Sequence, residues 1–201
     1  MANSSTAICN LALARAQASP INDITDTTSE AARQCGNLYP LLLDAVLRSH
    51  PWNFALKRVN LIASSTAPTF EFTYKYLLPS DCLRVLKLYD SDEDWLIEGR
   101  YLLTNESVVN IVYIFRNTDE SQYDPLFVEA LATKIASRLA AVLGANRTLA
   151  DSLSGDYKIL LAEARMMDGQ EGTPRNLRVK AGWIQARHNY RAGYNTDVGN
   201  S

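Results

Sequence analysis

Apolar residues recur at helical spacing near the start of the chain. Ile8 and Leu11 lie three residues apart within residues 4–18, which is the spacing of one face of a helix. Either Ser4 or Ser5 can accept a hydrogen bond from the first turn of that segment. We therefore expect a first helix over residues 4–18.

A second helix is predicted to begin near Thr27. The segment Thr27-Thr28-Ser29-Glu30 fits a capping box, in which the Thr27 hydroxyl accepts from the Glu30 amide while the Glu30 side chain reaches back. Pro40 lies inside the apolar pattern, and proline removes a hydrogen bond and clashes with the preceding turn, so a kink or break is expected near Leu38. The apolar positions of this helix are Ala31, Leu38, Leu42 and Val46.

The pattern changes from helical to alternating at Asn53. Within residues 70–77, aromatic side chains fall on one face and polar ones on the other, which predicts a half-buried strand. Closely spaced turns, such as the one at Gly99, separate this segment from the other short strands. Many short strands between frequent turns indicate an antiparallel platform or a small barrel. The other predicted strands span residues 53–62, 83–89, 95–98, 101–103 and 108–115.

Helical spacing returns after the strands. Asp124-Pro125 is a helix opening, with the aspartate as cap and the proline in the first turn. Gly144 ends that helix, Asn146 caps the next, and Gly169 ends it. The apolar positions of the two helices are Val128, Leu131, Ile135, Leu139 and Val142, then Leu149, Leu153, Tyr157, Leu160, Leu161, Ala164 and Met167.

This order of elements predicts an α+β protein. Residues 1–52 and 122–169 are expected to form a discontinuous antiparallel four-helix bundle, because their apolar stripes must pack together. Residues 53–121 form an antiparallel β insertion. Residues 170–201 form an extended C-terminal tail, in which apolar residues are too sparse and irregular for a fold of its own.

Charge is distributed unevenly along the chain. The net charge of the 201 residues is −2. Residues 173–201 hold five Lys or Arg against one acid, a charge of +4, which leaves −6 for the rest. A basic segment beside an acidic body is typical of an interaction tail. It can dock on a protein through its aromatic and arginine side chains, bind nucleic acid through phosphates and stacking, or remain solvated.

No metal or cofactor site is predicted. Cys9, Cys35 and Cys82 are far apart and form no CxxC pair, so we interpret them as reduced thiols, at least two of them buried. Asp90, Asp92 and Asp94 occupy the first, third and fifth positions of a calcium loop. Trp95, however, stands where that loop needs glycine, and no phosphate-binding glycine motif occurs in the chain.

Catalytic signals are weak as well. His50 could serve as a general base, but no nucleophile elbow accompanies it, and we expect it to cap the end of the second helix. The acidic residues at 90–94 are the only feature that favours a glycan hydrolase. Neither a signal peptide nor a run of apolar residues long enough to cross a membrane is found. The chain is therefore predicted not to be an enzyme.

One segment carries a resemblance to a known family. The run Arg48-Ser49-His50-Pro51-Trp52-Asn53-Phe54-Ala55, at the end of a helix that enters β structure, resembles the tail tubular protein A family, the head-to-tail adaptors (connectors) of short-tailed double-stranded DNA bacteriophages. The resemblance also includes Glu30-Ala31-Ala32-Arg33-Gln34-Cys35 and the strand-turn-strand from Tyr74 to Val85. It extends into the paired helices after Asp124.

This resemblance implies a structural role in the virion. Such adaptors form a ring, typically a dodecamer, between the portal protein and the tail nozzle, a tail tubular protein B-like partner. Genomic DNA passes through their channel without sequence-specific binding. A chain of this kind would be made in the host bacterial cytoplasm and would need no cofactor and no membrane.

Two sets of site residues follow from this interpretation. His50, Trp52 and Phe54 are expected to pack at the junction of the helical bundle and the β insertion. The C-terminal tail is expected to bind the portal through six side chains. They are Arg175, Arg178, Lys180, Trp183, Arg187 and Tyr190. Two alternatives stay open: a virion-associated glycan hydrolase, and a nucleic-acid-binding module acting through the basic tail.

Overall fold

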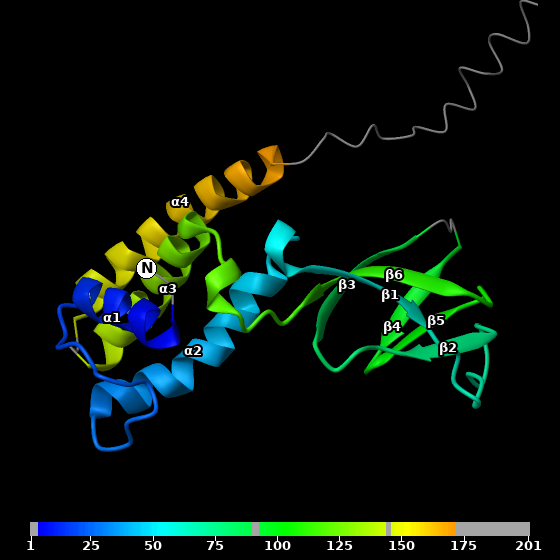
Figure 1. Ribbon diagram of the computed structural model, residues 1–201, viewed down its shortest axis with the longest axis horizontal. Helices are drawn as coiled ribbons and strands as arrows, with labels where there is room; N and C mark the ends of the chain where they lie inside the picture. The colour runs from blue at the N-terminus through cyan, green and yellow to red at the C-terminus, as the bar shows by residue number, and fades with distance from the viewer. Residues whose placement is uncertain (1–3, 90–92, 144–145, 172–201) are drawn as a thin grey trace, which may run out of the picture. The chain divides into compact units, whose positions relative to one another are not determined.

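A computed structural model describes residues 4–89, 93–143 and 146–171 of the chain. Within these ranges the protein is mixed α+β, with four α-helices and two three-stranded antiparallel sheets (Figure 1). The predicted α+β class is confirmed. The helices are α1 (Ser5–Arg15) and α2 (Glu30–Arg48), which precede the strands, and α3 (Pro125–Val142) and α4 (Arg147–Gln170), which follow them.

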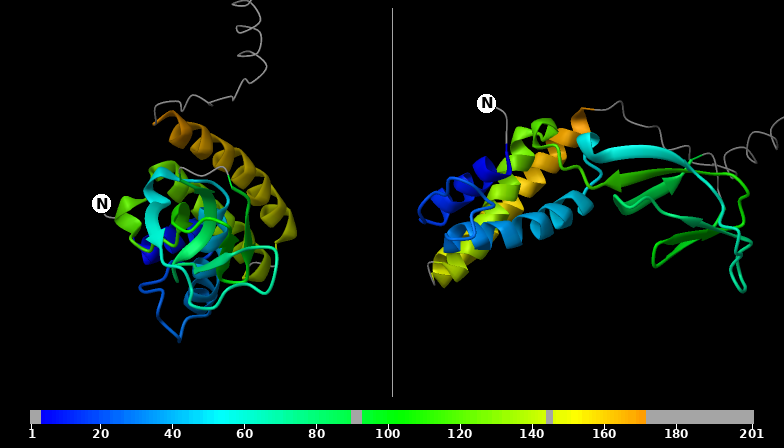
Figure 2. Two further views of the ribbon diagram at one scale, coloured as in Figure 1. Left: turned by 90° about the vertical axis from the view of Figure 1, so that its right-hand side faces the viewer. Right: turned by 60° about the horizontal axis from the view of Figure 1, so that its bottom comes forward.

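Helix α3 is the centre of the helical part. It contacts each of the other three helices and runs beside α4 in both views of Figure 2. Leu131, Ile135 and Leu139 are fully buried, as the helical spacing predicted. Asp124 caps α3 through hydrogen bonds from the two amides of Leu126 and Phe127. A helix surrounded on several sides must be apolar on several faces, and eleven residues of α3 are buried.

Helix α2 begins later than the capping-box prediction placed it. Asp26 accepts hydrogen bonds from both the amide and the hydroxyl of Thr28, which holds this segment in a turn. The N-cap is Ser29, whose hydroxyl accepts from the Ala32 amide at 3.3 Å. The prediction that Thr27 caps this helix is therefore wrong.

The buried face of α2 is displaced by one residue from the predicted one. Leu38 and Leu42 are only half-buried, whereas Tyr39 and Leu43 are buried. The buried set includes a cysteine and a tyrosine, which the apolar stripe had left out. It consists of Ala32, Cys35, Tyr39, Leu43, Val46 and Leu47.

Pro40 does not break α2. The helix continues from Glu30 to Arg48, so the predicted break near Leu38 is absent. Pro40 is exposed, so it lies on the solvent side of the helix, where a carbonyl group left without a backbone donor can bind water.

The strands pair into two sheets around a common core. One sheet has the order β1 (Leu56–Leu61), β6 (Val109–Phe115), β3 (Cys82–Leu88). The other has the order β2 (Tyr74–Leu77), β5 (Tyr101–Thr104), β4 (Trp95–Glu98). All pairings are antiparallel, as predicted. The buried residues between them are Leu61, Tyr76, Leu78, Val85, Leu88, Leu102, Val109, Ile111 and Tyr113.

Two strand predictions need correction. The strand expected over residues 70–77 is confined to Tyr74–Leu77; Phe70 is 80% exposed, and Glu71 has a positive φ of 72°, which is incompatible with extended backbone. The strand predicted over residues 83–89 is expected to alternate between two faces, but β3 does not do so regularly. Irregular register between Val85 and Lys87 places those two side chains on opposite faces.

The position of the α2 cap can be tested by two matched substitutions. Ser29→Ala removes the side chain that binds the Ala32 amide, so we expect the free energy of unfolding to fall by about 1 kcal/mol. Thr27→Ala removes a hydroxyl that caps nothing and should change the free energy of unfolding by less than about 0.5 kcal/mol. Urea denaturation measures the free energy of unfolding of both variants. An equal or larger loss for Thr27→Ala would show that Thr27 caps the helix.

Candidate functional site at the junction of helices and strands

The chain passes from α2 to β1 through a short buried segment. Residues Asn53–Ala55 form one turn of 3₁₀ helix between the two elements. Trp52 and Ala55 are completely buried, although they lie in a connection rather than in a regular element. Connections normally lie at the surface, so burial here marks a segment that holds other elements in place.

An aromatic cluster anchors this segment to α3. The ring centroids of Trp52 and Phe127 lie 5.0 Å apart in an edge-to-face arrangement, and Phe54 meets Phe127 at the same distance. Tyr123 completes the cluster, 5.2 Å from Phe127. Edge-to-face pairs contribute stability beyond the burial of their area. The indole N–H of Trp52 donates to the Val46 carbonyl at 3.1 Å, so its burial leaves no polar atom unpaired.

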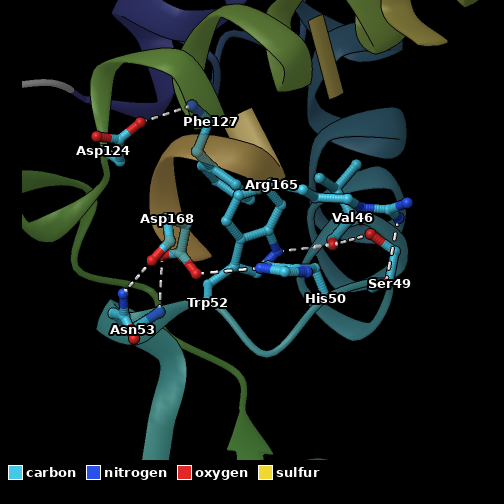
Figure 3. A network of polar contacts seen from close by, with 9 residues as sticks. All are labelled: Val46, Ser49, His50, Trp52, Asn53, Asp124, Phe127, Arg165 and Asp168. Atoms are coloured by element: carbon cyan, nitrogen blue, oxygen red, sulfur yellow. Dashed lines mark hydrogen bonds and ion pairs between the residues drawn. The ribbon is translucent and has the colours of Figure 1, made fainter. Parts of the chain in front are cut away.

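Asp168 ties the last turn of α4 to the same segment (Figure 3). Its carboxylate accepts from the Asn53 amide at 2.9 Å and lies 3.1 Å from Nε2 of His50. The Asn53 side chain donates in return to the Asp168 carbonyl at 2.7 Å. The Asp168 side chain is only 7% exposed, and a buried carboxylate is costly unless several donors satisfy it.

His50 does not cap α2, contrary to the prediction. The cap is Ser49, whose hydroxyl donates to the Val46 carbonyl at 2.7 Å. Arg165 of α4 donates to the Ser49 carbonyl at 3.2 Å. The His50 ring turns instead toward Asp168 and packs edge-on against Trp52, with ring centroids 4.7 Å apart. A carboxylate in the core offers a better hydrogen-bond partner than a helix end that already has a cap.

Burial sets the protonation of His50. Burial lowers the pKa of His50 below its ordinary value, and Arg165 acts in the same direction, while the hydrogen bond and charge of Asp168 oppose the change without reversing it. His50 is therefore neutral at pH 7 and donates its Nε2 hydrogen to Asp168. This tautomer binds the carboxylate by a hydrogen bond rather than by a full ion pair.

The pair of His50 and Asp168 does not assemble a nucleophilic site. The nearest hydroxyl in sequence, that of Ser49, gives its hydrogen to the Val46 carbonyl and has none to offer the imidazole, as a nucleophile must. Within the described ranges, no group of three or more His, Cys, Asp or Glu side chains is arranged to hold a metal ion. The contacts of His50 and Asp168 join α4 to the segment between α2 and β1.

Two of the three cysteines, predicted to be far apart, lie together in the helical core. Cys9 and Cys35 are buried, whereas Cys82 is half-buried. The Cys9 thiol is hydrogen-bonded to Cys35 across α1 and α2, and this bond together with burial raises the pKa of Cys9. A buried thiol with a raised pKa is unreactive, so we interpret Cys9 as a packing group.

Several predicted residues lie outside the described ranges. They include all six tail residues assigned to portal binding, from Arg175 to Tyr190, and Gly144. Asp90 and Asp92 of the considered calcium loop also lie outside them. The sequence analysis missed Asp168 and Phe127, which hold the junction together. Asp168 had a detectable signal, because a carboxylate in the last turn of a helix is unfavourable beside the dipole and indicates a specific partner.

Comparisons with known proteins leave this site without a named relative. No known family model matches the chain, and a search of curated proteins found no significant match. Over the part of the chain that the structure describes, no helix is both long and apolar enough to cross a membrane.

Removing the Asp168 carboxylate should loosen the junction. Asp168→Ala removes a buried carboxylate that accepts from the Asn53 amide and is expected to lower the free energy of unfolding by about 2 kcal/mol. Glu163→Ala, at an exposed acid on the same helix, is the matched control and should stay within about 0.5 kcal/mol of the parent. Equal effects in urea denaturation would show that Asp168 has no special role.

The stability of the fold should depend on pH through His50. Its pKa is lower in the folded state than in the unfolded chain, so the unfolded chain binds the proton first. Stability is then complete above the unfolded pKa of about 6.5 and declines as pH falls through that value toward the folded pKa. We expect urea midpoints to decrease between pH 7.5 and 5.5. In His50→Gln the urea midpoint should depend less on pH. An unaltered pH dependence in this variant would contradict the role assigned to His50.

Proposed function

We propose that this protein is a structural adaptor of a short-tailed phage virion. It forms a ring, with twelve subunits as the expected number, between the portal protein and the tail nozzle. The ring completes the channel through which genomic DNA leaves the head. The protein acts by binding neighbours, and no chemical step is assigned to it.

The junction segment is the observation that carries this proposal. The segment Arg48 to Ala55, one of those that carry the resemblance to the tail tubular protein A family, also contains the residues that bind the helices to the strands. Trp52 packs on Phe127, and Asn53 binds Asp168. A short sequence in which most side chains have a structural partner is expected to be characteristic of one architecture rather than of a reaction. The partners of the junction residues therefore support a fold and an assembly role shared with the tail tubular protein A family.

The finer architecture belongs to the same proposal. We infer that the four helices act as one antiparallel bundle, that the two sheets form a platform facing another part of the particle, and that residues 170–201 form the tail. An adaptor needs separate surfaces for its neighbours, and such a division of the chain provides them. A ring uses one heterologous interface that closes by rotation.

Exposed apolar side chains supply candidate contact surfaces. On α4, Ile159 is 69% exposed and Met166, two turns later, is 58% exposed. These two residues lie on one face of the helix. On the β part, Leu77 and Leu96 are also exposed. Large apolar side chains that remain accessible in pairs are typical of surfaces that a partner covers.

The basic tail is proposed to contact the portal. The tail holds five positive charges together with Trp183 and Tyr190. Arginine, tryptophan and tyrosine are the residue types that dominate protein interfaces. A segment that becomes ordered on binding yields little affinity for each unit of area. Repetition around a ring compensates for that, because each bound subunit raises the effective concentration of the next.

Deleting residues 173–201 tests the role of the tail. The truncated protein should keep its far-UV circular dichroism and its urea midpoint. Its affinity for immobilised cognate portal rings, measured by interferometry, should fall at least tenfold, as the loss of about 1.4 kcal/mol or more implies.

A full-length variant separates charge from chain length. Replacing Arg175, Arg178, Lys180 and Arg187 with Gln retains every residue of the tail and removes four charges. This variant should bind the portal more weakly than the parent and more strongly than the truncation, because its aromatic anchors remain. Truncated protein that binds as well as the full chain would refute the role of the tail.

A further inference from the structure

The sheet β1-β6-β3 is more basic than the rest of the protein. Its three strands contain Lys57, Arg58, Arg84 and Lys87 and no acidic residue, in a chain whose net charge is −2. Lys57 pairs with Asp81. The other three cations form no ion pair with any residue that the structure describes.

Register places these three cations on one face. Arg58 and Lys87 both lie opposite Val112, so they flank it in one row across the sheet. Arg84 lies opposite Ile114, two residues further along the same strand. Residues directly opposite each other in antiparallel strands point to the same side, and side chains two apart on a strand share a face.

A groove lies on this face. It has a volume of about 460 Å³, and its lining includes Arg58, Val112, Tyr89 and an asparagine pair. Asn60 Nδ2 donates to Asn110 Oδ1 at 3.0 Å. This bond occupies one group of each amide, and the Asn60 oxygen and the Asn110 amino group have no partner among the described residues.

Tyr89 adds an exposed aromatic ring beside the cations. It is 60% exposed, and the Lys87 ammonium lies 5.5 Å from its centroid. The Tyr89 amide donates to the Asn110 carbonyl at 2.7 Å, which fixes the residue to the end of the sheet. The ring is therefore positioned without being covered.

We propose that this groove binds single-stranded nucleic acid. Arg58, Arg84 and Lys87 would contact successive phosphates. A base would stack on Tyr89, and the free groups of the Asn60–Asn110 pair can accept from and donate to base edges. Unpaired cations beside an exposed aromatic ring on a sheet are the elements from which sequence-tolerant single-strand sites are built. This site is distinct from the tail and does not depend on the proposed adaptor function.

The test uses the full-length protein and a fluorescein-labelled single strand of thymidines. The variant Arg58→Gln/Lys87→Gln removes two phosphate contacts. Each contact contributes about −0.7 to the slope of log affinity against log salt, so the slope should lose about 1.4. Arg147→Gln/Lys158→Gln, at two exposed cations of α4, removes the same charge elsewhere and should leave the slope unchanged. Tyr89→Leu should weaken binding roughly tenfold by loss of stacking.

Two results would overturn the proposal. If the sheet double variant binds the oligonucleotide with the slope of its α4 control, any nucleic-acid affinity belongs to another surface, such as the basic tail. If the double variant instead changes the sedimentation of the protein alone and leaves oligonucleotide binding unaltered, the groove is a contact between copies of this chain. Portal binding is measured separately and tests the adaptor function. Neither of these two results would contradict that function.

Discussion

The burial of Trp52 is the constraint on which the helical part and its connection to the strands depend. A tryptophan placed between two elements must be covered on all sides, and here α3 supplies the cover through Phe127. That contact fixes where the chain leaves α2. Asp168 then holds the last turn of α4 to the next residue, Asn53. The start of β1 and the end of α4 are in this way fastened to the same point, so neither can shift without opening a buried aromatic cluster.

This arrangement explains why a histidine and an aspartate lie together at the junction. Their pairing satisfies a carboxylate that the core encloses, and the low pKa of His50 keeps the imidazole a neutral donor. A charged pair at this position would have to be desolvated at a cost that its attraction repays only with excellent geometry. The pair therefore fastens α4 to the segment that follows α2.

Elements with a strong local signal could be predicted from the sequence. The Asp124-Pro125 opening of α3 and the Asn146 cap of α4 are both determined by neighbouring residues. The α2 cap could not be assigned with the same success, because Asp26 competes for the preceding turn. The alternating pattern also placed Phe70 in a strand. The backbone turns at Glu71, so Phe70 lies on a loop instead.

The site and the cationic groove required three-dimensional information for a different reason. Asn53 and Asp168 are 115 residues apart, and no local pattern links them. The face of the sheet that holds the groove brings Arg58 and Lys87 together across an intervening strand, and no local sequence pattern links these two cations. Net charge concealed this clustering, because an acidic total says nothing about how the basic residues are arranged on a sheet.

The adaptor account is tested most directly by sedimentation velocity of the full-length protein, alone and mixed with the cognate portal ring. The account predicts a light species that moves onto the portal with about one chain per portal subunit, as a closed ring on a matching ring requires. A light species that ignores the portal at any ratio would contradict it.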